Sequence, residues 1–165
     1  MTISDLFKHR ILPFENADIK LTKLFSFFLH TAPTIDSRSS TTISEERLEH
    51  NWKNFINTFN SEEYCFLSQQ CSIEKYFDKF NLTLAIELKR KTKAFVCKRK
   101  DLKETDYTCF LRHIRNAIAH SNVYVVNAGN RKFILFEDFN KSKKQSSRIL
   151  LSQTDLKRLK DEIMK

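Results

Sequence analysis

The sequence predicts a mainly helical protein with a small β-hairpin before its last helix, and three observations support this fold class. The first is composition: 15 Phe stand beside one Gly and two Pro, a balance that favours long helices over a turn-rich β architecture. The second is an apolar repeat at three- and four-residue spacing in residues 105–122. The third is a hairpin pattern around the only glycine, Gly129. A chain of 165 residues supports one domain with a real hydrophobic core.

Residues 1–42 are expected to hold the N-terminal helices and a linker. Residues 4–12 can form a short helix that is stopped by a proline. Residues 15–30 carry apolar side chains at helical spacing and predict a second helix. Residues 31–42 combine a proline with a run of Ser and Thr, which is the composition of a linker.

Residues 43–122 are expected to form the core of a helical bundle. Residues 42–45 fit a capping box, and the apolar residues after them predict a third helix to about residue 60. Helical periodicity then continues, with two breaks, over residues 61–96. The last helix of this part spans residues 105–122 and has the clearest apolar stripe in the chain.

Residues 123–165 are expected to hold the hairpin and the last helix. The runs 123–126 and 131–136 are rich in β-branched and aromatic residues and flank the glycine turn. Residues 148–151 can add a third short strand. Ser152 is a suitable N-cap for the final helix, whose first turn is acidic, as the helix dipole prefers.

Composition narrows the classes of function. The net charge of +9 draws the protein to polyanions, although charge alone does not establish nucleic-acid binding. The four cysteines form no Cys-x-x-Cys pair and are expected to be small buried residues in a reducing cytoplasm, without zinc. No metal or cofactor is expected. No apolar run approaches the roughly 20 residues of a membrane span, and the first residues do not resemble a signal peptide, so the predicted location is cytoplasmic.

The helix at residues 105–122 carries the candidate site. At about 100° per residue, its polar side chains gather opposite Leu111, Ile114 and Ile118. This polar face contains no carboxylate, which indicates an anionic ligand. Asn116 and His120 are four residues apart, so the amide is expected to hydrogen-bond the imidazole. The residues predicted to share this face are Arg112, Arg115, Asn116, Ala119 and His120.

The six residues Arg-Asn-Ala-Ile-Ala-His at positions 115–120 resemble the Arg, polar residue, three residues, His signature of HEPN domains. The resemblance is strongest to HEPN proteins of bacterial plasmids and defence islands and covers roughly residues 60–165. It implies a HEPN-like helical bundle in which the motif helix is followed by a short hairpin and a last helix.

The resemblance also implies a metal-independent endoribonuclease that acts as a toxin or defence effector. Family members are homodimers with a composite site that releases a 2′,3′-cyclic phosphate. Arg115 and His120 would then be catalytic and Asn116 would orient the imidazole. The partners implied are RNA, a second copy of the chain, and an antitoxin or a nucleotidyltransferase. Two alternatives stay open: a module that binds RNA or a nucleotide without turnover, and a dimeric interaction subunit.

Further substrate contacts are expected from basic residues near the motif. Lys98, Arg99 and Lys100 precede the motif helix by a short loop and form either a phosphate-binding patch or a solvated helix end. Arg112 lies outside the motif and contacts either phosphate or an acidic neighbour.

Overall fold

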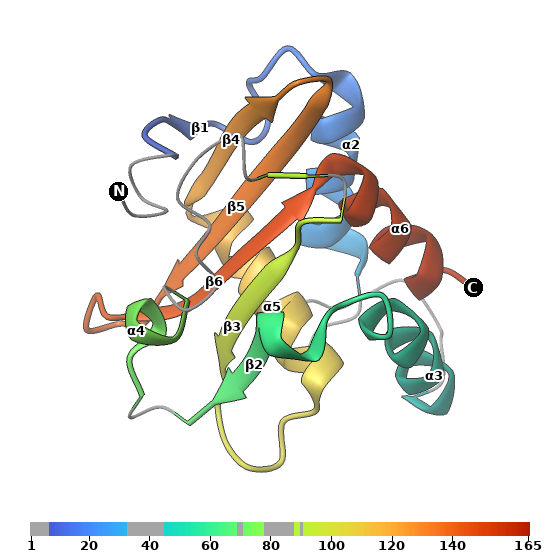
Figure 1. The fold of residues 1–165 in the computed structure, drawn as a ribbon, viewed down its shortest axis with the longest axis vertical. Coiled ribbons are helices and arrows are strands. Elements are labelled where there is room, and N and C mark those ends of the chain that lie inside the picture. Colours follow the sequence, from blue (N-terminus) through green and yellow to red (C-terminus); the bar gives the residue numbers. More distant parts are fainter. Residues whose placement is uncertain (1–6, 33–44, 69–70, 78–87, 90) are drawn as a thin grey trace.

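A mixed β-sheet is the centre of the computed structural model, in which residues 7–32, 45–68, 71–77, 88–89 and 91–165 are described (Figure 1). The sheet has six strands in the order β1-β4-β5-β6-β3-β2. Only β2 and β3 run parallel, and the other neighbours are antiparallel. The strands are β1 (Arg10–Ile11), β2 (Tyr64–Leu67), β3 (Ala94–Lys98), β4 (Val123–Ala128), β5 (Arg131–Phe139) and β6 (Gln145–Ser152).

Most helices pack on one face of this sheet. Figure 1 shows α5 behind the sheet and the short α4 in front of it. The helices are α2 (Ile19–Ser26), the π-helical turn η1 (Phe27–Thr31), α3 (Glu45–Ile56), the 3-10 turn η2 (Ser61–Glu63), α4 (Ile73–Phe77), α5 (Asp106–Ala119) and α6 (Gln153–Ile163). Within the described residues, no helix is both long enough and apolar enough to cross a bilayer.

The prediction of a mainly α bundle with two or three short strands is therefore wrong. Residues 64–67 and 94–96, which were expected to be helical, lie in β2 and β3. Every residue of β3 is buried, so this strand is apolar on both faces and lacks the alternation that distinguishes a half-exposed strand. Short apolar runs of this kind cannot be separated from buried helix by periodicity.

Both faces of the sheet are covered. In β5, Ile134 and Phe136 face the larger core, which also contains apolar residues of α2, α3, α5 and α6. Phe133 and Leu135 alternate with them and face a second core that includes Ile73 of α4. This two-sided burial fixes the register of the strands, because a shift by one residue would exchange the two sets of side chains.

The C-terminal part of the chain follows the sequence prediction closely. The β4–β5 hairpin turns at Gly129, whose φ of 63° is the value that the first residue of a two-residue type II′ turn needs. The Ser152 side chain accepts a hydrogen bond from the backbone N–H of Asp155 and so caps α6.

The N-terminal predictions agree less well. The last part of the predicted helix 4–12 instead contains β1, which pairs with β4 at the edge of the sheet. Asp18 caps α2, which continues into η1 and so accounts for most of the second predicted helix. Parts of four predicted features lie outside the described residues: residues 4–6 of the first helix, most of the linker, the start of the capping box, and residues 78–87 of the long helical run.

Candidate active site

The position of α5 is set by its apolar side. Phe110, Ile114 and Ala117 are fully buried against the sheet and the neighbouring helices. The helix begins where the Thr105 side chain accepts a hydrogen bond from the N–H of Thr108, so Thr105 is the N-cap. The predicted amphipathic helix is confirmed, with its apolar side toward the core.

Arg112 is paired with a carboxylate. Its Nε and Nη2 lie 2.7 and 2.9 Å from the two carboxylate oxygens of Glu104. Only 13% of the Arg112 side chain and 2% of the Glu104 side chain are exposed. The polar face has no carboxylate of its own, but Glu104 from the preceding loop faces it. Of the two alternatives for Arg112, the structure has the acidic neighbour.

Glu104 is ionised in this arrangement. Burial raises the pKa of its carboxyl group, but hydrogen bonds from Arg112 and from the backbone N–H of Lys100 outweigh this effect and hold the pKa below its usual value. The resulting ion pair ties the loop before α5 to the middle of the helix.

His113 lies beside this pair and is completely buried. Its Nδ1 is 2.8 Å from the carboxylate of Asp138, and its Nε2 is 2.8 Å from the backbone carbonyl of Lys98. Arg112 Nη2 also lies 3.4 Å from Nε2, so both ring nitrogens have hydrogen-bond partners inside the protein. A ring held in this way has no free nitrogen for proton transfer to a substrate.

Asp138 also holds the motif. Its carboxylate accepts a hydrogen bond from the Asn116 side chain at 3.2 Å, and the Asn116 oxygen accepts one from Arg115 Nη1 at 3.3 Å. These bonds replace the predicted one between Asn116 and the ring of His120. Asp138 lies beside a register shift between β5 and β6, and β-bulges of this kind often direct a side chain near a functional site.

His120 ends the helix and is exposed. The chain turns back after it through Ser121, whose φ is 56°. The N–H of Ser121 bonds to the Ile118 carbonyl and the N–H of Asn122 to the Ala117 carbonyl, which is the Schellman pattern of helix ends. The position of the His120 backbone is therefore fixed, while its ring has no hydrogen-bond partner among the described residues.

The predicted substrate-binding residues before α5 do not form one patch. Lys98 is buried in β3. Arg99 forms an ion pair with Asp106 and lies 4.7 Å from the centre of the Phe66 ring. Only Lys100 is exposed. These residues belong to a strand and the loop after it, and alternate side chains of a strand point to opposite faces. Their contact with phosphate stays a prediction.

Sequence reasoning missed two residues that organise this site, Glu104 and Asp138. Asp138 did leave a signal, since it is an acidic residue two positions after buried Phe136 and therefore on the core-facing side of β5. Within the described residues, no group of three His, Cys, Asp or Glu side chains could hold a metal ion.

Comparison with known proteins gives one match. A family model described as HEPN pEK499 p136 matches residues 11–165. No curated protein and no solved structure matches the chain. The matched segment includes the whole of α5 and both acidic residues that contact it.

Proposed function

The chain belongs to the HEPN pEK499 p136 family, and on this basis we propose that it is a metal-independent endoribonuclease. We further propose that it acts as a toxin or defence effector of a mobile element. One observation carries the proposal: His120 is exposed at the end of α5, one turn beyond Arg115 and Asn116. The interior of the protein holds Asn116 through Asp138, so the face is pre-organised.

The residue types suit cleavage by the 2′-hydroxyl of the RNA. An imidazole removes the proton of this hydroxyl, and the 2′-oxygen attacks the adjacent phosphorus. The bond to the 5′-oxygen breaks, and an imidazolium supplies the proton that this leaving group needs. The products are a 2′,3′-cyclic phosphate and a 5′-hydroxyl. The guanidinium of Arg115 would contact the charged phosphate oxygens during the reaction.

One copy of the chain offers one suitable histidine on α5. His113 is buried and both of its nitrogens are engaged, so it cannot serve beside His120. In a dimer about a two-fold axis, each copy would bring Arg115, Asn116 and His120 to a common cleft. The composite site would then contain one imidazole as base and one as acid.

The proposal is tested by incubating single-stranded RNA and transfer RNA with the protein in EDTA and mapping the new ends. Wild type is expected to produce 2′,3′-cyclic phosphate ends, and His120→Ala none. His50→Ala is the matched control because it also removes an exposed histidine, from α3. Full activity of His120→Ala, or intact RNA under conditions where wild type binds it, would remove the nuclease proposal.

A second candidate is a module that binds RNA without cleaving it. The observation in its favour is that the His120 ring has no hydrogen-bond partner within the described part of one chain, so a single copy does not orient it for proton transfer. This candidate predicts binding that weakens with salt, and RNA that is recovered intact.

A further inference from the structure

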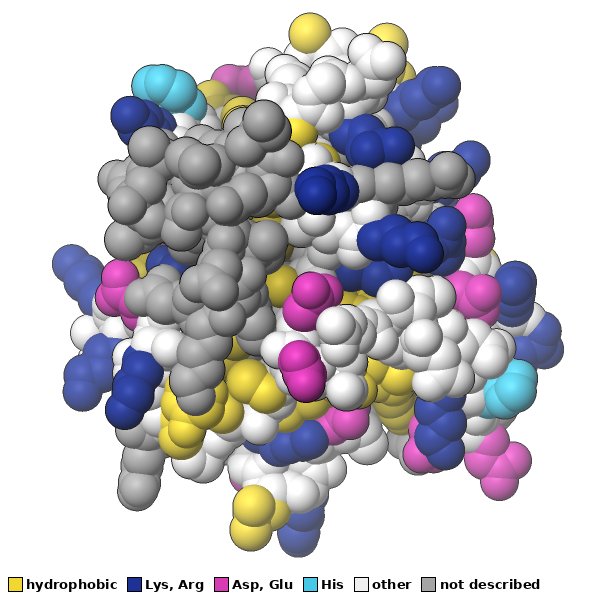
Figure 2. Space-filling model, viewed as in Figure 1, with side chains coloured by type: hydrophobic (Ala, Val, Ile, Leu, Met, Phe, Trp, Pro, Cys, Tyr) yellow, Lys and Arg dark blue, Asp and Glu magenta, His cyan; other side chains and the backbone are white. Residues whose placement is uncertain are grey.

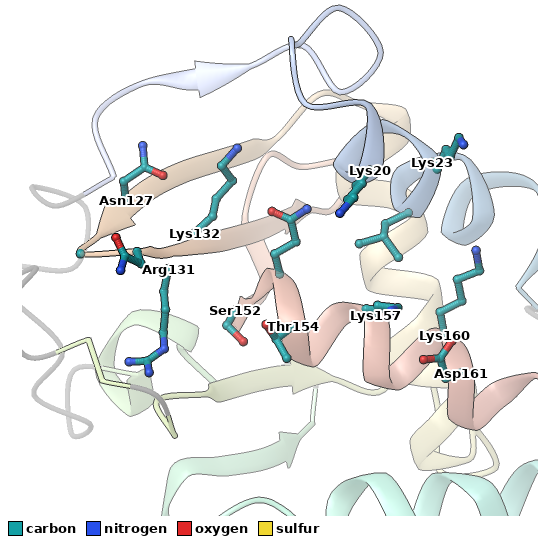
Figure 3. A pocket seen from close by; sticks show the side chains of 14 residues that line it. Lys20, Lys23, Asn127, Arg131, Lys132, Ser152, Thr154, Lys157, Lys160 and Asp161 are labelled. Atoms are coloured by element: carbon teal, nitrogen blue, oxygen red, sulfur yellow. The ribbon is translucent and has the colours of Figure 1, made fainter.

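A basic pocket lies away from the motif face of α5. Its volume is about 770 Å³, and it opens between the end of the β4–β5 hairpin, α2 and the first turns of α6 (Figure 3). Asn127 of β4 is part of its wall. His120 precedes β4, whose six residues at roughly 3.3 Å each place the hairpin end of the pocket about 20 Å from the motif.

The lining of this pocket is strongly cationic. It contains six Lys or Arg side chains and one carboxylate, that of Asp161. The whole chain has 29 Lys and Arg against 20 Asp and Glu. The ratio of cations to carboxylates is therefore much higher in the pocket lining than in the whole chain. In Figure 2, dark blue Lys and Arg side chains gather at the upper right of the molecule, where Figure 1 shows α2 and α6. The cations are Lys20, Lys23, Arg131, Lys132, Lys157 and Lys160.

Most of these cations are uncommitted. Lys132 forms an ion pair with Asp18 at 2.8 Å, and the Lys160 ammonium lies 5.3 Å from the centre of the Phe27 ring. The other four form no ion pair or hydrogen bond through their side chains with the part of the chain that the structure describes. Gathering like charges without acidic partners is unfavourable for the free protein, and an anionic ligand would relieve the repulsion.

The remaining lining groups suit phosphate rather than bases or a folded partner. Asn127, Asn130 and Gln153 add amide groups, and the first turn of α6 adds backbone N–H groups at the positive end of a helix dipole. Among the described residues of the lining, Leu24 is the only large apolar one, and none carries an aromatic ring on which a base could stack. Lysine is depleted in protein–protein interfaces, which usually depend on aromatic anchors.

We propose that this pocket binds the sugar-phosphate backbone of the RNA substrate, outside the cleavage site. The proposal rests on the proposed function for the identity of the nucleic acid. Contacts to phosphate strengthen binding and position the strand without reading its sequence. The pocket would therefore add affinity for RNA that extends several nucleotides beyond the cleaved bond.

The test measures how salt changes RNA affinity. The probe is a fluorescent 20-nucleotide RNA with 2′-O-methyl groups, which keeps its phosphates but cannot be cleaved through a 2′-hydroxyl. Lys20→Gln/Lys157→Gln removes two exposed cations from facing helices of the pocket. Lys141→Gln/Lys144→Gln removes two exposed cations from the β5–β6 loop and is the control of equal charge.

The pocket variant is expected to bind with a shallower salt dependence. Each lost phosphate contact lowers the slope of log K against log salt by roughly 0.7, so the slope should fall by about 1.4. If the proteins bind equally at 1 M salt, this is an affinity loss of about 25-fold at 0.1 M. The control should retain the wild-type slope.

Three results would overturn the proposal. One is an equal change in both variants, which would show that only net charge matters, and another is no change in either. The third is unchanged RNA binding together with lost binding of an oligo-glutamate peptide, which would assign the pocket to an acidic protein. The probe cannot be cleaved, so the expected slopes do not depend on nuclease activity. A protein that binds RNA through the pocket but does not cleave RNA would therefore support this proposal while refuting the proposed function.

Discussion

Replacing Arg112 by glutamine should destabilise the protein strongly. The substitution removes the charge that faces Glu104 and breaks two hydrogen bonds of 2.7 and 2.9 Å. The glutamate side chain is 2% exposed, so water cannot replace the lost partner. Removing one member of a buried ion pair costs about 3–5 kcal/mol. For a chain of this size, the midpoint of thermal unfolding should fall by about 10 °C.

Arg115→Gln is the matched control because it changes the same residue type one turn along α5. Within the described residues, the Arg115 side chain donates one hydrogen bond, to Asn116 at 3.3 Å. The free energy of unfolding should therefore fall by less than about 1 kcal/mol. Both variants can be measured by urea unfolding, with the fluorescence of the single tryptophan, Trp52, as the probe. Trp52 is buried in the core, so its emission should change on unfolding.

A double variant completes the experiment. In Glu104→Gln/Arg112→Gln neither charge of this buried pair remains, so this protein should be more stable than Arg112→Gln alone. Equal loss of stability in Arg112→Gln and Arg115→Gln would refute the reasoning. A double variant no more stable than Arg112→Gln would also refute it, because the cost would not come from an unpaired carboxylate.

Three further predictions concern pH, the end of α5 and the cysteines. The pKa of Glu104 is lowered in the folded state, so its ionised form stabilises the protein above the ordinary pKa of 4.5. This stabilisation is lost as the pH falls further and Glu104 becomes protonated. In urea unfolding between pH 5 and about 3, the free energy of unfolding should therefore fall less in Glu104→Gln than in wild type. Ser121→Gly should raise the free energy of unfolding by about 0.5–1 kcal/mol in the same assay, since φ is 56° there, and a loss of stability would contradict this. Burial raises the pKa of the Cys97 and Cys109 thiols, so iodoacetamide should leave both unmodified in the native protein. Rapid labelling of either cysteine, detected by mass spectrometry, would contradict this.

Local patterns predicted the elements whose signals are contained in one segment. The apolar stripe of α5 identifies its buried side, Gly129 identifies the hairpin turn, and Ser152 identifies the start of α6. Each of these depends on residues within a few positions of one another. Such signals suffice for the motif helix, for the hairpin after it and for the last helix.

The sheet was missed because its evidence is not local. β3 lies between β6 and β2, and these neighbours are separated from it by long stretches of sequence. Its side chains are buried on both faces, so hydrophobic alternation does not appear. Pairing with distant strands, which no short window contains, decides that these residues are extended.

The candidate site was predicted only in part for a related reason. The helical wheel placed Arg112 and Asn116 on the polar face, but it could not show what the rest of the chain brings to them. Glu104 is eight residues before Arg112 and Asp138 is 22 after Asn116. Glu104 comes from the loop before α5, and Asp138 comes from β5. Only the folded chain therefore shows that Arg112 and Asn116 bind carboxylates of the protein itself.

The proposed composite site is tested most directly with a dimer that has one wild-type copy and one His120→Ala copy. The two copies carry different affinity tags, are expressed together and are purified in succession on both tags. RNA cleavage at the level of the His120→Ala homodimer is the predicted result, because one imidazole cannot act as both acid and base in a single turnover. Half the wild-type rate, or a full rate from a protein that is monomeric in solution, would contradict the account.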